Sequence, residues 1–262
     1  MSQKTTIALI IAVFVLMIDA ALYYFKPLGN NFYIISDLAV VVYASAAVAA
    51  GFYTAKSKGI SSLHKKTLLL IAFGALSWLI GEASWAIQEI LLKIQNPFPS
   101  IGDAFWLFGY LLVFAGIYDT FQIAKTQEIK IEKIALLLAF MIASLIAVTH
   151  IIHPSLADPG LTLLGKIITF AYLFFDLMLV IFITALLYLF YTSKIIQSWI
   201  WILISMIFLT FADLLYMGLA GSFISGSFIG MLWDAHYIML AFGFFYYRRI
   251  VETLTTAKSK KS

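Results

Sequence analysis

Long runs of apolar residues, separated by short polar connections, dominate the chain. A helix needs roughly 20 mostly apolar residues to cross a bilayer, and the sequence contains eight stretches of this kind. They cover residues 5–25, 32–54, 67–93, 102–123, 132–152, 165–191, 196–219 and 225–247. The pattern predicts an all-α polytopic membrane protein with eight transmembrane helices in one transmembrane domain, residues 1–262.

The composition supports this interpretation. Hydrophobic residues make up 63% of the chain and charged residues 11%, and the mean hydropathy is +1.00. Soluble domains are about 45–50% apolar and about 25% charged. We therefore expect a multi-pass protein of the cell membrane, in contact with the lipid bilayer. The chain has no cysteine, which excludes disulfides and thiol chemistry.

The basic residues follow the predicted topology. If both termini lie on one side of the membrane, fourteen of the seventeen Lys and Arg residues fall on that side. The positive-inside rule then places both termini in the cytoplasm, which requires an even number of spans. This distribution explains the net charge of +4 without a nucleic-acid partner. The basic segment 250–262 is predicted to be a C-terminal tail that contacts anionic lipid.

Three acidic residues in the first half of the chain have counterparts in the second half. The matched pairs are Glu82 with Asp213, Asp103 with Asp234, and Asp37 with Asp176. Glu82 and Asp103 lie 21 residues apart in the sequence, and so do Asp213 and Asp234. We therefore predict two parallel repeats of four helices, about residues 5–125 and 132–249, related by an axis along the membrane normal as in parallel-repeat transporters.

Acidic residues inside the predicted spans give the strongest indication of function. An ionisable residue in a bilayer costs about 2.5 kcal/mol or more, so such residues usually face a bundle interior or a wet cavity. On this topology the acids gather in the outer half of the membrane. We expect an outward-facing cavity that holds a small ligand, a lipid headgroup or a cation. The predicted ligand-binding residues are Glu82, Asp213, Asp103, Asp234, Asp37, Asp176, Trp85, Glu89 and His236.

Several of these residues also have a purely structural interpretation. A carboxylate near a helix N-terminus caps free amide groups, and this alternative applies to Asp37, Asp103, Asp176 and Asp234. Glu89 and Asp19 lie near enough to helix ends to reach the outer interface. A lone intramembrane histidine such as His236 is more often a hydrogen-bonded interior residue than a metal ligand. No sequence motif indicates a catalytic residue, a particular metal or a particular cofactor.

Residues 81–110 carry a resemblance to a known family. Gly81, Glu82 and Trp85 form a G[DE]xxW pattern, and the following PSIGDAFWLFGY is similar to a PSxADxFYLxGY pattern. The later ADLLYMGLAG and LWDAHYIMLAF resemble the second half of the same family. The chain thus resembles the membrane-embedded sensory region found ahead of diguanylate cyclase, phosphodiesterase and histidine kinase domains. The resemblance implies a sensory role, and because no such domain is fused here we expect a separate signalling protein as partner.

Three functional hypotheses fit the sequence. The first is a sensory or ligand-binding module without enzymatic activity. The second is a proton- or cation-coupled small-molecule transporter, for which a parallel repeat and intramembrane acids are natural. The third is a membrane-embedded lipid hydrolase that uses paired acids as general acid and base, although the sequence offers no convincing nucleophile.

Overall fold

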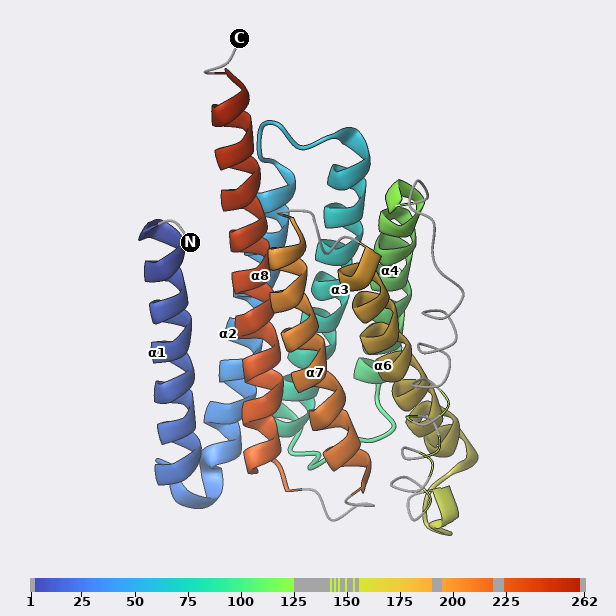
Figure 1. Cartoon of the computed structure of the whole chain (residues 1–262). Coiled ribbons are helices and arrows are strands. Elements are labelled where there is room, and N and C mark those ends of the chain that lie inside the picture. The colour runs from blue at the N-terminus through green and yellow to red at the C-terminus, as the bar shows by residue number, and fades with distance from the viewer. Residues whose placement is uncertain are drawn as a thin grey trace.

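The chain is described here by a computed structural model that covers residues 3–124, 156–189, 195–218 and 224–259, with five isolated positions between 142 and 153. All regular secondary structure in this part of the chain is helical. Seven of its helices are long and apolar enough to cross a membrane (Figure 1). The prediction of an all-helical protein with the make-up of a membrane protein is therefore confirmed. The predicted helix over 132–152 falls mostly outside the described residues.

The long helices begin and end close to the predicted boundaries, with one exception. They are α1 (Gln3–Phe25), α2 (Phe32–Ala55), α3 (Ser62–Ala86), α4 (Ile101–Ala124), α6 (Leu163–Leu189), α7 (Ile196–Gly218) and α8 (Phe228–Ser259). Two short segments, η1 (Gly29–Asn31) and the π-helical η2 (Ile87–Leu91), precede α2 and follow α3. The exception is α8, which continues to Ser259 where the sequence predicted an end near residue 247 and a tail. Figure 1 shows this red helix projecting beyond the others.

The described helices pack into one bundle. α8 contacts α7, α2 and α1, while α3 lies between α2 and α4, and α6 lies against α7 and α4. α1 is at the edge of the bundle and has its main contact with α8. The largest buried side chains come from most of the other helices, including Leu68, Tyr110, Leu179, Met206 and Phe244. The outward surfaces of α1 and of the other helices expose many large apolar side chains, as expected of helices that face lipid.

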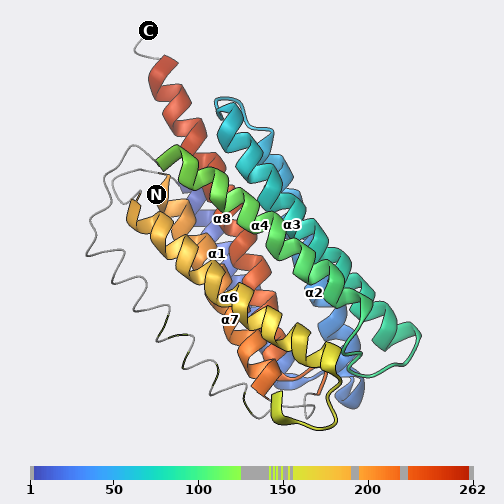
Figure 2. The ribbon, with the colours of Figure 1, turned by 90° about the vertical axis from the view of Figure 1, so that its right-hand side faces the viewer.

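Two glycines bring α3 and α4 into close contact, and Figure 2 shows these helices side by side. A Cβ atom on Gly74 would lie 3.0 Å from the Gly109 carbonyl oxygen, and one on Gly109 would lie 2.9 Å from the Gly74 carbonyl oxygen. Small residues allow such backbone approach between membrane helices. The approach places Trp78 of α3 against α4, where its indole Nε1 donates to the Trp106 carbonyl oxygen at 2.9 Å.

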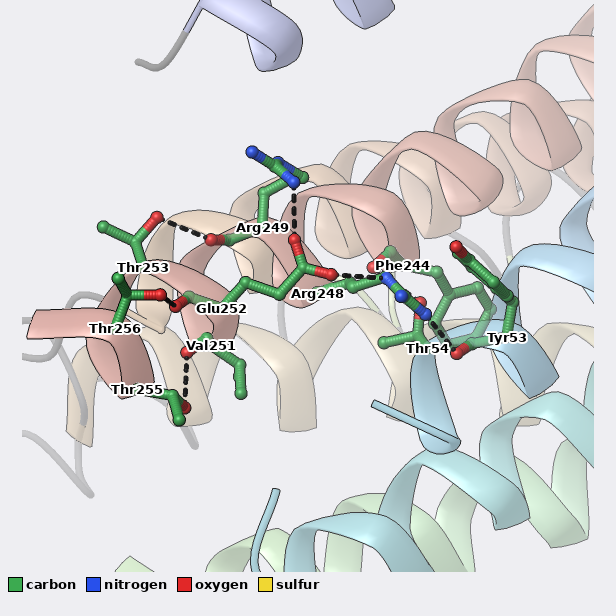
Figure 3. Close-up of polar contacts among 10 residues, drawn as sticks. All are labelled: Tyr53, Thr54, Phe244, Arg248, Arg249, Val251, Glu252, Thr253, Thr255 and Thr256. Carbon is green, nitrogen blue, oxygen red and sulfur yellow. Dashed lines mark hydrogen bonds and ion pairs between the residues drawn. The ribbon is translucent and has the colours of Figure 1, made fainter. Parts of the chain in front are cut away.

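The C-terminal half of α8 carries a basic cluster that is fixed to α2 (Figure 3). The Arg248 guanidinium lies 3.6 Å from the centre of the Tyr53 ring and donates to the Tyr53 carbonyl oxygen at 2.9 Å. Glu252 accepts from Arg248 at 2.8 Å and from Arg249 at 2.5 Å. One turn away, the Thr54 hydroxyl donates to the Phe244 carbonyl oxygen at 2.9 Å. The ends of α2 and α8 are therefore joined by directed polar contacts.

The substitution Thr54→Val is expected to lower the free energy of unfolding by about 1 kcal/mol, because it removes this interhelical hydrogen bond and keeps the shape. The Thr54 side chain is fully buried between the two helices. Reversible unfolding in mixed detergent micelles measures the effect. Ser45→Ala is the control, because Ser45 is exposed and bonds only to Val41 in its own helix. If both substitutions lower the free energy of unfolding equally, the hydrogen bond from Thr54 to Phe244 does not stabilise the contact between the two helices.

Candidate functional site

A cavity lies at the end of the bundle where α1 ends and α8 begins. It contains about 860 Å³ of space that protein atoms do not fill, including the part that opens to the outside. All seven long helices contribute lining side chains, and the connections before α4 and α8 add Phe98, Ser225 and Gly226. About 100 Å³ of this space is open to the centre of a water-sized molecule, which is room for several water molecules. The concave shape and the mixture of aromatic and acidic lining residues are those of a small-molecule site.

Four carboxyl groups line this cavity, and none of the described lining residues is Lys, Arg or His. The acids are Asp37 on α2, Glu82 on α3, Asp103 on α4 and Asp213 on α7. Buried carboxylates without a cationic partner are strongly unfavourable, because their lost hydration is not replaced. A bound cation or bound protons are therefore needed to stabilise these carboxyl groups.

Glu82 and Asp213 have matching surroundings. Glu82 Oε1 accepts from the Trp106 indole at 3.1 Å and from the Tyr237 hydroxyl at 2.7 Å. Asp213 Oδ1 accepts from the Trp233 indole at 2.7 Å, and Asp213 Oδ2 lies 3.3 Å from the Tyr110 hydroxyl. Each acid is thus held by one indole from the next helix and one phenol from the other half of the chain.

Asp103 both caps a helix and lines the cavity. Its Oδ2 accepts from the Ser100 backbone N–H at 2.5 Å, and the Ser100 hydroxyl in turn accepts from the Gly102 N–H at 3.1 Å. This reciprocal arrangement satisfies free amide groups at the start of α4. Asp103 Oδ1 accepts from the Tyr172 hydroxyl of α6 at 2.8 Å. The capping interpretation therefore holds for Asp103 without removing it from the cavity.

The other three acids that the sequence placed near helix starts lie deeper and contact side chains. Asp176 accepts a short hydrogen bond from the Tyr110 hydroxyl, and Asp234 Oδ2 accepts from the Tyr23 hydroxyl at 3.1 Å. Both are fully buried, behind tyrosines that line the cavity. Asp37 lines the cavity directly, and its Oδ2 is buried without a hydrogen-bond donor among the described residues.

Carboxyl groups meet in pairs around the cavity. The pairs are Asp19 with Asp234, Asp37 with Glu89, and Asp176 with Asp213, each within hydrogen-bonding reach. In each pair at least one buried oxygen lacks a donor among the described residues. Two carboxylates at such close range repel one another in surroundings of low polarity. Each pair is therefore stable only with a shared proton or another cation.

Glu89 and Asp19 do not reach the interface, so that alternative is wrong. Their exposed fractions are 2% and 0%. Glu89 Oε1 accepts from the Asn96 backbone N–H at 2.7 Å and from the Ser225 hydroxyl at 2.5 Å, so it ties the two lining connections together. Glu89 does not itself line the cavity, although Glu82 does. Glu89 lies within the wider turn of η2, so it does not keep the α-helical register of Glu82.

His236 is an interior residue. Its side chain is fully buried, and its Nδ1 lies 2.8 Å from the Ser205 hydroxyl and 3.0 Å from the Ser205 carbonyl oxygen. Its ring packs edge to face against Trp78 and Tyr237 and does not line the cavity. In the part of the chain that the structure describes, no three His, Cys, Asp or Glu side chains are grouped to hold a metal ion.

Aromatic rings form most of the remaining cavity wall. Those of the tryptophans and tyrosines are Trp78, Trp85, Trp106, Trp233, Tyr23, Tyr110, Tyr172, Tyr216 and Tyr237. Trp85 lies 5.8 Å from Trp106 and 6.4 Å from Tyr216, measured between ring centres. Trp78 and Trp85 both lie in this wall, and Trp85 is one of the residues predicted from the sequence. Most of the tyrosines were missed, although the four-residue spacing of Trp106 and Tyr110, repeated in α8, puts each such pair on one helical face.

The structure thus brings together most of the predicted site. Five of the nine predicted residues line the cavity, namely Asp37, Glu82, Trp85, Asp103 and Asp213. Asp176, Asp234 and Glu89 lie directly behind lining residues, through the contacts given above. Ligand contact by any of these residues stays a prediction.

No protein-family model, curated protein or solved structure matches the chain. The resemblance to membrane-embedded sensory regions therefore stays a prediction that depends on the residues of 81–110 and their later counterparts. The geometry of the cavity and its four carboxyl groups are the features that indicate function.

Proposed function

We propose that the chain is a membrane-embedded binding protein, with a sensory role, for a small organic cation. The observation that carries the proposal is the cavity wall itself: four carboxyl groups set among aromatic rings, with no basic side chain among the described lining residues. A ligand with a positive charge and an apolar body satisfies both kinds of wall.

The carboxyl groups supply the electrostatic part of binding. Asp37 lines the cavity, and its Oδ2 is buried without a donor among the described residues, so a cation bound beside this residue would balance its charge. A unit charge 4 Å from a carboxylate gains about 4 kcal/mol at an effective dielectric constant of 20. A bound cation would also relieve the repulsion between Asp37 and Glu89.

The aromatic rings select an organic cation over a bare metal ion. A cation over the face of a Trp or Tyr ring gains about 0.5–2 kcal/mol, and aromatic cages are the usual means of holding quaternary ammonium groups. An ammonium group with methyl or larger substituents fits these features.

Matching contacts in the two halves support the proposed four-plus-four repeat. α3 packs on α4 as α7 packs on α8, α2 packs on α3 as α6 packs on α7, and α2 packs on α8 as α6 packs on α4. The side chains that contact Glu82 and Asp213 match in the same way. Trp106 and Tyr237 contact Glu82, and Trp233 and Tyr110 contact Asp213. The predicted helix 132–152 would then correspond to α1, for a total of eight.

The charge distribution supports a cavity that faces outward and termini that lie in the cytoplasm. Most basic residues of the described helices lie at the opposite end from the cavity, including Lys66 and the Arg248–Arg249 pair; Lys166, near the start of α6, is an exception. In Figure 1 the first turn of α1 and the last turn of α8 point toward that end. Basic residues favour the cytoplasmic side.

A proton-coupled transporter is the second candidate, favoured by the carboxyl pairs. It ranks lower because fully buried apolar side chains, among them Ile71, Leu179, Ile183 and Leu240, lie in the core between the cavity and the basic end. A transported ligand needs polar groups along a path through that half. The lipid hydrolase gains no support, because no described His lines the cavity to activate Ser36 or Ser225.

The acids Glu82 and Asp213 provide the test, with choline as the probe. Glu82→Gln and Asp213→Asn keep the shape and an acceptor oxygen for the indole and phenol donors, and each is expected to weaken choline binding about tenfold, or about 1.4 kcal/mol. Calorimetric titration of the purified protein measures the affinity. Asp119→Asn is the matched control, because Asp119 is an acid at the other end of the bundle, paired with Lys66 at 2.9 Å. If neither cavity variant alters choline affinity, the site is wrong.

A further inference from the structure

A second group of acids lies outside the cavity, where α1 meets α8 and α2. Asp19 of α1 and Asp234 of α8 are both fully buried, with exposed fractions of 0%. Neither residue lines the cavity. Their carboxyl groups lie within hydrogen-bonding reach of each other. The pair therefore joins the outermost helix to the centre of the bundle.

Hydroxyl groups occupy one oxygen of each carboxyl and leave the other oxygen unoccupied. The Tyr43 hydroxyl donates to Asp19 Oδ1 at 3.4 Å, and the Tyr23 hydroxyl donates to Asp234 Oδ2 at 3.1 Å. Tyr23 is also 2.7 Å from the Ser36 hydroxyl. Asp19 Oδ2 and Asp234 Oδ1 are buried and have no donor among the described residues. Each carboxyl of the pair thus has one buried oxygen without a described donor.

The surroundings add no positive charge to the pair. Among the described residues, the titratable groups that face it are Tyr43 from α2, Tyr23 from α1, Tyr237 from α8 and Glu82 from α3. None of these groups is basic. Two uncompensated carboxylates in an apolar interior are strongly unfavourable, so the pair requires a cation.

We propose that Asp19 and Asp234 form a second cation site, which takes a small monovalent cation without its water shell, either a proton or Na⁺. The described polar contacts of the pair are all with oxygen atoms, and hard cations prefer oxygen ligands. The two carboxyls and the hydroxyls of Tyr23, Ser36 and Tyr43 would provide its ligands. Both acids are fully buried outside the cavity, so this site is distinct from the one proposed for the organic cation.

Tyr23 links this second site to the cavity. Its ring lines the cavity, while its hydroxyl bonds Asp234. A cation between the two acids would fix Asp234 and with it the position of Tyr23 in the cavity wall. Because α1 has its main contact with α8, the same cation would also hold α1 in the bundle. The link to the cavity rests on the proposed function, whereas the site itself does not.

Thermal unfolding of the purified full chain tests the site. It is measured in NaCl and in KCl at equal ionic strength, from acidic to alkaline pH, for the wild type, Asp19→Asn and Asp234→Asn. In KCl the wild type is expected to lose stability toward alkaline pH relative to Asp19→Asn, because the pair loses its shared proton and the carboxylates then repel. If Na⁺ occupies the site, NaCl restores the wild type and leaves both variants unchanged; if only a proton does, the salts give equal results.

Asp119→Asn is the control and is expected to respond as the wild type does. The proposal is overturned if Asp19→Asn and Asp234→Asn show the same dependence on pH and on Na⁺ as the wild type. Choline affinity, measured in the wild type and in Asp19→Asn, tests the link through Tyr23, and equal affinities at every pH and in both salts overturn that link. Absence of choline binding in the wild type overturns the cavity proposal alone, because the unfolding measurement needs no ligand.

Discussion

Replacing Gly74 by leucine is expected to abolish the folded bundle or to lower its free energy of unfolding by about 3 kcal/mol or more. A Cβ atom at this position would lie 2.6 Å from Val113 Cγ2 and 3.0 Å from the Gly109 carbonyl oxygen. The backbone oxygen cannot rotate away as a flexible side chain would. α3 and α4 must therefore separate, which moves Trp78 away from its bond to the Trp106 carbonyl and opens the cavity wall.

Size-exclusion elution and the thermal midpoint in detergent measure this effect. Ala49→Leu is the matched control, because Ala49 is on the exposed surface of α2 and a larger apolar side chain there meets no packed helix. We expect the control to elute and melt as the wild type does. A Gly74→Leu protein with wild-type stability would show that the close approach of α3 and α4 is not required.

The apolar runs were enough to predict the helices, because a bilayer demands about 20 apolar residues in every span. The boundary that failed was the end of α8. The last span was predicted to end at residue 247, just before Arg248 and Arg249, with a basic tail over residues 250–262. In the structure Arg248 stacks on Tyr53 and both arginines pair with Glu252, so the helix continues with its charges satisfied.

The acids of the site could be predicted because their cost in a bilayer limits them to few places. Their individual roles could not, because these depend on partners far away in the sequence. Only folding brings Glu82 to Tyr237. Only folding places Tyr110 between Asp176 and Asp213. The burial of Glu89 likewise depends on Ser225, which is 136 residues away.

The spacing of 21 residues between acids was a poor guide to equivalent positions. Asp103 caps α4 and bonds Tyr172, whereas Asp234 bonds Tyr23 and lies beside Asp19. The Trp and Tyr contacts of Glu82 and Asp213 instead relate Trp106 to Trp233 and Tyr110 to Tyr237. Aromatic residues therefore show the proposed repeat in α4 and α8 more clearly than the acids do.

Removing the charge from the probe ligand is expected to weaken its binding by about 100-fold or more. Choline and its neutral carbon analogue dimethylbutanol have the same shape and hydroxyl group. The analogue loses the cation–π contact, about 2 kcal/mol in a desolvated cage, and the attraction to the cavity carboxyls. A factor of 100 corresponds to about 2.7 kcal/mol.

Calorimetric titration of the purified wild-type protein with both compounds, in one buffer and at one pH, is the most direct test that the cavity binds an organic cation. If the cavity binds an organic cation, we expect measurable binding of choline and no detectable binding of dimethylbutanol. Equal affinities for the two compounds, or no binding of choline, would contradict it.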